Sequence, residues 1–88
     1  MEASQAWRSL FENWPNNIPR EGMLVTSVET LQFNDFMVSG GLLLIDRDRP
    51  DAMGARKVMV PYSNIIAVKM QTTMELAQFQ VMGFQRPL

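Results

Sequence analysis

The chain has 88 residues, of which 47% are apolar, and eight basic and nine acidic residues leave a net charge of −1. A chain of this length holds one hydrophobic core, so we expect a single domain over residues 1–88. Cysteine and histidine are absent, which excludes disulfides, the ligands typical of structural zinc sites and the common nucleophile–base pairs of catalysis. A generic nucleic-acid binder would carry a basic excess, and this composition has none.

The sequence contains no apolar run of the length that a membrane span needs. Residues 1–6 also lack the basic start and the apolar segment of a secretory signal. We therefore expect a cytoplasmic protein.

Residues 3–14 have the pattern of an amphipathic helix that Ser4 caps and Pro15 ends. Its apolar positions share one side at helical spacing: Ala6, Trp7, Leu10, Phe11 and Trp14. We expect this side to cover an open end of the domain. The alternative is an exposed aromatic face for a partner.

A barrel is predicted over residues 22–70. Residues 23–29 and 31–38 alternate like strands, and Asp35 falls on the apolar side of the second, which indicates a bend, a bulge or a strand end near Asn34. Leu31, Phe33 and Met37 would share one face. The pattern does not decide between a hairpin turn and one long bent strand at residues 29–30.

Gly40-Gly41 is the strongest turn signal, and the apolar run 42–45 that follows predicts a strand covered on both faces. One face would be the barrel interior, and the other would lie under the N-terminal helix. Residues 46–55 form a charged loop.

Residues 56–62 are expected to form a further strand. Pro61 cannot donate to a sheet ladder, so it indicates an edge or a strand end. Residues 62–65 predict a single helical turn, and residues 66–70 a last strand. In the C-terminal extension, residues 71–88, we expect a short helix over 72–80 with Thr72 or Thr73 as its cap, or a loosely held tail.

An N-terminal helix, short bent strands, Phe33-Asn34-Asp35-Phe36 and the closing segment 60–68 together resemble the Sm-like (LSm/Hfq) family. The resemblance implies a mainly β fold: a small five-stranded antiparallel SH3-like barrel with an N-terminal helix. It also implies a homo-oligomeric ring that pairs edge strands and binds RNA. The closing segment is similar to PRC-barrel-like and PH-like protein-interaction domains as well.

The chain departs from the Sm-like pattern where the family binds RNA. Bacterial members have Tyr-Lys-His, whereas Ser63 and Asn64 follow Tyr62 here. Eukaryotic members have a base-contacting asparagine where this chain has Met37 and Val38. The fold resemblance therefore extends further than the resemblance in function.

The charged loop offers a carboxylate cluster at Asp46, Asp48 and Asp51. Such a cluster could serve a small ligand-handling protein or a hydrolase. Arginines alternate with these acids, however, which is typical of a solvated, salt-bridged loop. The spacing also does not fit an EF-hand. We expect no catalytic residue, no metal site and no cofactor.

RNA or partner binding would use basic side chains beside aromatic or amide groups. The residues that fit are Arg47, Arg49, Arg56, Lys57, Tyr62, Asn64 and Phe36. Self-association is the interpretation we favour, because a short barrel must protect its edge strands and the eight methionines suit adaptable apolar contacts. The sequence thus predicts a non-enzymatic, oligomeric binding module whose partner is a protein or RNA.

Overall fold

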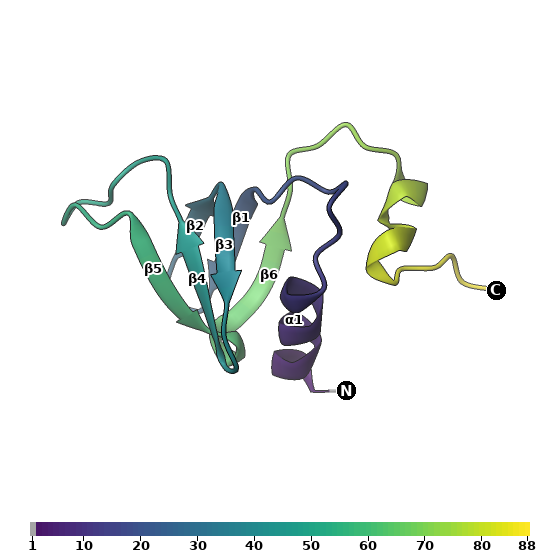
Figure 1. The fold of residues 1–88 in the computed structure, drawn as a ribbon, viewed down its shortest axis with the longest axis horizontal. Coiled ribbons are helices and arrows are strands. Elements are labelled where there is room, and N and C mark those ends of the chain that lie inside the picture. The colour runs from purple at the N-terminus through teal and green to yellow at the C-terminus, as the bar shows by residue number, and fades with distance from the viewer. Residues whose placement is uncertain (1) are drawn as a thin grey trace.

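An N-terminal helix and six strands in two antiparallel sheets form the domain in the computed structural model, which describes residues 2–88 (Figure 1). One sheet has the order β2-β1-β6 and the other β3-β4-β5. The elements are α1 (Ala3–Glu12), β1 (Gly22–Thr26), β2 (Thr30–Phe33), β3 (Asp35–Val38), β4 (Leu42–Asp46), β5 (Lys57–Pro61), the 3-10 turn η1 (Tyr62–Asn64), β6 (Ile65–Lys69) and the 3-10 helix η2 (Leu76–Met82). The prediction of five strands is wrong by one, and residues 2–88 form no closed barrel.

The extra strand arises at Asn34, where the predicted strand 31–38 leaves one sheet and enters the other. This break shifts the alternation, so that Phe33 and Phe36 are both buried and Met37 faces outward. The expected shared face of Leu31, Phe33 and Met37 is therefore wrong beyond the bend. Arg20 braces the bend, since its guanidinium lies 4.7 Å from the centre of the Phe36 ring.

Between β1 and β2 the chain makes a hairpin turn rather than one long bent strand. Thr26 holds the turn, because its N–H donates to the Glu29 carbonyl at 2.8 Å and its hydroxyl oxygen accepts the Glu29 N–H at 3.1 Å. On its other side, β1 pairs with β6. The first and last strands of the domain are thereby joined.

Strand β4 is buried on one face only, contrary to the expectation of two covered faces. Leu43 and Ile45 are fully buried, whereas Leu42 is exposed and Leu44 half-buried. Phe11 of helix α1 belongs to the same core cluster as Leu43 and Ile45, so the helix lies on the interior side of this sheet. Within residues 2–88, the outer face of the sheet β3-β4-β5 carries the exposed side chains of Met37, Leu42 and Met59.

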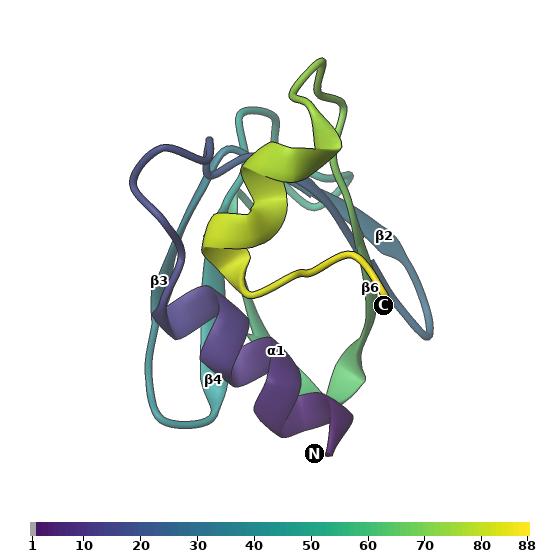
Figure 2. The same ribbon diagram turned by 90° about the vertical axis from the view of Figure 1, so that its right-hand side faces the viewer.

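Helix α1 contributes Phe11 to an aromatic cluster at the centre of the core, and Figure 2 shows the helix lying across the side of the domain. The Phe11 ring centre is 5.0 Å from that of Phe36 and 5.4 Å from that of Trp14. The indole N–H of Trp14 donates to the Ile18 carbonyl at 3.0 Å. The covering role predicted for this helix is confirmed for Phe11 and Trp14.

The ends of α1 differ from the prediction. The helix begins at Ala3 after Glu2, so Ser4 lies inside it and is not the cap. It ends at Glu12, before Pro15, and the Asn13 side chain donates to the Ser9 carbonyl at 2.8 Å.

Residues 70–88 extend away from the sheets and run past α1 (Figure 1). The 3-10 helix η2 begins later than predicted, and its cap is Glu75 rather than Thr72 or Thr73. Within Leu76–Met82 no residue is fully buried, although Phe79 and Met82 pack partly against the core. No helix in residues 2–88 has the length and apolarity needed to cross a membrane.

Candidate functional site

The charged loop between β4 and β5 is built by its own backbone and by Asp51. At its base the Arg47 N–H donates to the Arg56 carbonyl at 2.9 Å. At its tip the Asp51 carboxylate accepts the N–H groups of Ala55 and Met53, each at 2.8 Å. These two bonds lower the pKa of Asp51. Its carboxylate is therefore a turn-forming group that holds the loop in shape.

The other acids of this loop do not converge with Asp51. The Asp46 carboxylate pairs with the Lys57 ammonium across β4 and β5 at 2.8 Å. Asp48 is exposed. Within residues 2–88 no group of three or more possible ligands could hold a metal ion. The carboxylates thus lack the paired, pocketed arrangement that general acid–base catalysis needs.

Basic residues gather at one end of β5, and Asn64 lies beyond its other end in η1. Arg47 and Arg56 are opposite one another at the base of the loop, and Arg49 is exposed farther along it. The Arg47 Nε is buried with no hydrogen-bond partner within residues 2–88. The structure therefore brings together the basic residues predicted from the sequence but separates them from Asn64.

The two aromatic residues predicted for this site belong to the core. Phe36 and Tyr62 are buried, and both pack against Phe11. Burial raises the pKa of the Tyr62 hydroxyl, and the nearby Glu12 carboxylate raises it further. Neither ring presents a face to solvent on which a nucleic-acid base could stack. Their expected role at the surface does not fit this structure.

Sequence reasoning missed an apolar strip on the outer face of the sheet β3-β4-β5. Met37 lies opposite Leu44, and Leu44 lies opposite Met59, so that one side chain from each strand forms a row across the sheet. Leu42 continues the strip toward the Gly40-Gly41 turn. A shallow groove of about 260 Å³ runs along these residues. The sequence could not predict this row, because it depends on how residues 35–38, 42–46 and 57–61 pair with one another.

Each sheet has two edge strands within residues 2–88, β2 and β6 in one sheet and β3 and β5 in the other. The β3 edge is partly occupied, because the Phe36 N–H donates to the Asp35 carboxylate at 2.8 Å and the Phe36 carbonyl accepts from the Arg20 guanidinium at 3.5 Å. The edges of β5 and β6 are the two ends of the strand order when β2 and β3 are followed as one bent strand. Each carries a large exposed apolar side chain, Met59 on β5 and Ile66 on β6. Edge strands of this kind present free N–H and carbonyl groups to another chain.

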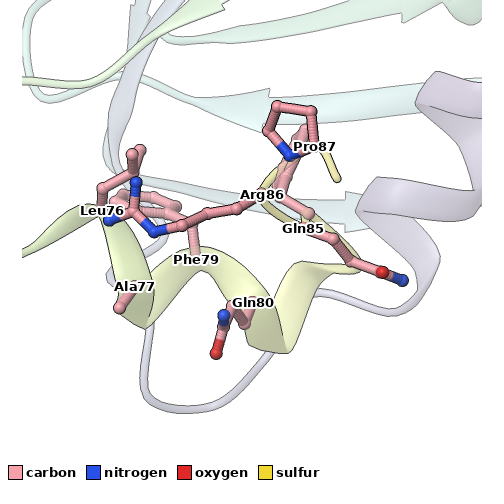
Figure 3. Close-up of a pocket in the computed structure, with 8 residues that line it drawn as sticks. Leu76, Ala77, Phe79, Gln80, Gln85, Arg86 and Pro87 are labelled. Carbon is pink, nitrogen blue, oxygen red and sulfur yellow. The ribbon is translucent and has the colours of Figure 1, made fainter.

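The C-terminal extension forms a separate apolar surface. A cavity of about 380 Å³ lies between η2 and the segment after it, and Figure 3 shows Leu76, Phe79 and Pro87 around it. A second hollow of about 570 Å³ lies between α1 and this extension, with Trp7 and Phe84 among the residues that line it. Both are open apolar surfaces without clustered ionisable groups.

Comparison of the chain with protein-family models, with curated proteins and with solved structures found no match. Any function must therefore be argued from the surfaces described above.

Proposed function

We propose that this protein is a non-enzymatic, homo-oligomeric binding module built on an open Sm-like or SH3-like barrel. The strand order supports the fold part of the proposal. If β2 and β3 are taken as one strand bent at Asn34, the order becomes β6-β1-β2/β3-β4-β5, with the helical turn η1 before the last strand. Counted in this way the strands would number five, as in the fold that the sequence resemblance implies.

The observation that carries the functional part is the pair of edge strands β5 and β6, which carry exposed apolar side chains. Both β5 and β6 end a sheet, and each bears an exposed apolar residue, Met59 and Ile66. The apolar strip across Met37, Leu44 and Met59 runs up to one of these edges. Small single-core domains gain stability from association, and exposed apolar surface beside an unpaired edge favours it.

A protein partner is favoured over RNA by the same surfaces. The burial of Phe36 and Tyr62 leaves the basic loop without the stacking rings that single-stranded RNA recognition uses. The engagement of Asp46 with Lys57, and of Asp51 with its own loop, takes support away from a hydrolase at this loop.

Light scattering over a range of concentrations tests the proposal. We expect a mass above that of one chain for the unmodified protein, and a lower mass for at least one of the variants Met59→Lys and Ile66→Lys, each of which places a charge at one of the two edges. Met53→Lys is the control, because Met53 is even more exposed but lies in the charged loop, away from either edge. A mass of one chain at every concentration would overturn the proposal.

Titration with short A-rich and U-rich RNA at two salt concentrations checks the competing ligand class. Phosphate contacts weaken as salt rises. We expect no binding at low salt. Salt-sensitive binding that is lost in Arg47→Ala or Arg56→Ala would instead establish RNA as the ligand.

A further inference from the structure

The edges of β5 and β6 differ in regularity. Strand β5 pairs with β4 over all its residues, from Lys57 to Pro61, without a shift in register. Strand β6 is irregular, because its pairing with β1 skips Ile66 and leaves that residue as a bulge. Bulges twist an edge and interrupt its ladder of hydrogen bonds. Of these two edges, β5 is therefore the better template for a further strand. It has five residues, whereas the edge strands β2 and β3 have four each.

The hydrogen bonds at the base of the charged loop show which backbone groups of β5 are free. Since the Arg47 N–H donates to the Arg56 carbonyl, the residues of β5 that bond to β4 are the alternate ones, Val58 and Val60. Lys57 and Met59 then direct both their N–H and carbonyl groups to the open edge. Pro61 directs only a carbonyl group there, because it has no N–H.

We propose that β5 pairs antiparallel with β5 of a second copy about a two-fold axis at Met59, which joins two sheets β3-β4-β5 into one. This inference rests on the proposed function and names the contact that performs it. The N–H of each Met59 would donate to the Met59 carbonyl of the other copy. The N–H of each Lys57 would donate to the Pro61 carbonyl of the other copy.

The residues at the two ends of β5 disfavour the registers that centre the axis on either of them. A shift that centres the axis on Lys57 would place two lysines directly opposite one another, which is unfavourable. A shift that centres it on Pro61 would oppose two residues without N–H groups, so no bond would form there. With Met59 at the centre, each lysine lies opposite a proline and the charges are at opposite ends of the paired segment.

The side chains support the same arrangement. Pairing at Met59 would continue the row Met37–Leu44–Met59 into its copy, so that the apolar strip crosses the whole joined sheet. A two-fold contact of this kind is closed, because both copies use the same edge, β5, and neither leaves that edge free for a third copy. The partner that fits the β5 edge is therefore a second copy of this chain, and the product is a dimer.

Cysteine cross-linking tests the two-fold axis. The chain has no cysteine of its own, so any disulfide must involve the introduced residue. Residues that exchange both bonds in an antiparallel pair have Cα atoms about 5.5 Å apart, which lies within the range that a disulfide spans. We expect Met59→Cys to form a covalent dimer on mild oxidation. The matched control is Met37→Cys, because Met37 is 71% exposed and Met59 70% on the same face.

In the proposed dimer the two Met37 positions would be five strand spacings apart, roughly 24 Å. Met37→Cys should therefore cross-link only through random collisions. Equal cross-linking of the two variants would overturn the two-fold pairing. If the unmodified chain still exceeds the mass of one copy in that case, association through another surface stands; if it does not, the proposed function fails as well.

A non-covalent measurement avoids dependence on the disulfide. Met59→Lys would place two like charges opposite one another and remove the contact between the methionines, so we expect the dimer dissociation constant to rise by about tenfold or more. Met37→Lys should leave it unchanged. Sedimentation equilibrium gives both values, and circular dichroism shows that each variant is folded. Equal dissociation constants for the two variants would contradict the proposal.

Discussion

Phe11 anchors helix α1 to the hydrophobic core. It is 1% exposed, and it packs against four other aromatic rings, those of Trp14, Phe33, Phe36 and Tyr62. Truncating a buried phenylalanine to alanine costs about 3–5 kcal/mol, because it removes apolar contacts and leaves a cavity. The free energy of unfolding of a domain this size is about 4–13 kcal/mol. Phe11→Ala should therefore remove a large part of the total.

Urea unfolding followed by far-ultraviolet circular dichroism measures this loss. With a slope of about 1–3 kcal/mol per molar urea, a loss of 3 kcal/mol lowers the midpoint by about 1–3 M. The control is Phe84→Ala, which makes the same truncation at a residue that is 59% exposed. It should cost less than about 0.5 kcal/mol, as surface changes do. A loss at Phe11 no greater than that at Phe84 would refute the account of α1 as part of the core.

Three further substitutions test other parts of the structure. Gly22→Ala should cost about 1–3 kcal/mol, because an added Cβ would lie 2.7 Å from the Lys69 carbonyl oxygen; Gly40→Ala, where the space is open, should be neutral in the same urea assay. Arg20→Ala should cost about 1 kcal/mol by removing the contact with the Phe36 ring, and an unchanged midpoint would contradict this. Asp51 has a pKa below its ordinary 3.8, so the stability that its charge provides is present above that pH and is lost as the pH falls further. Unfolding between pH 2 and 6 should show a smaller acid-induced loss in Asp51→Asn than in the unmodified chain, and identical pH profiles would contradict the role of this carboxylate.

Local signals in the sequence located most elements. The Gly40-Gly41 turn, the helical turn after Pro61 and the break near Asn34 all depend on residues whose backbone preferences act over a few positions. Pro61 indicated that its strand, β5, lies at the edge of a sheet. Proline has no backbone N–H, so in a central strand one hydrogen bond to the neighbouring strand would be missing.

The orientation of side chains could not be predicted where it depends on tertiary structure. The apolar run 42–45 suggested burial on both faces, but alternate residues point outward because no element within residues 2–88 covers that side of the sheet. Met37 was expected inside, since the shift at Asn34 is a consequence of the chain changing sheets. Phe36 and Tyr62 were assigned to a binding surface for the same reason: their types suit stacking, and only the packing of α1 shows that they fill the core.

Amide hydrogen exchange at β5 tests self-association through this edge most directly. In a single chain the Met59 N–H points to the open edge, whereas the Val60 N–H faces β4. We predict that protection of the Met59 amide rises with protein concentration, while the Val60 amide is already protected at the lowest concentration. Exchange at Met59 that is equally fast at every concentration would contradict the account.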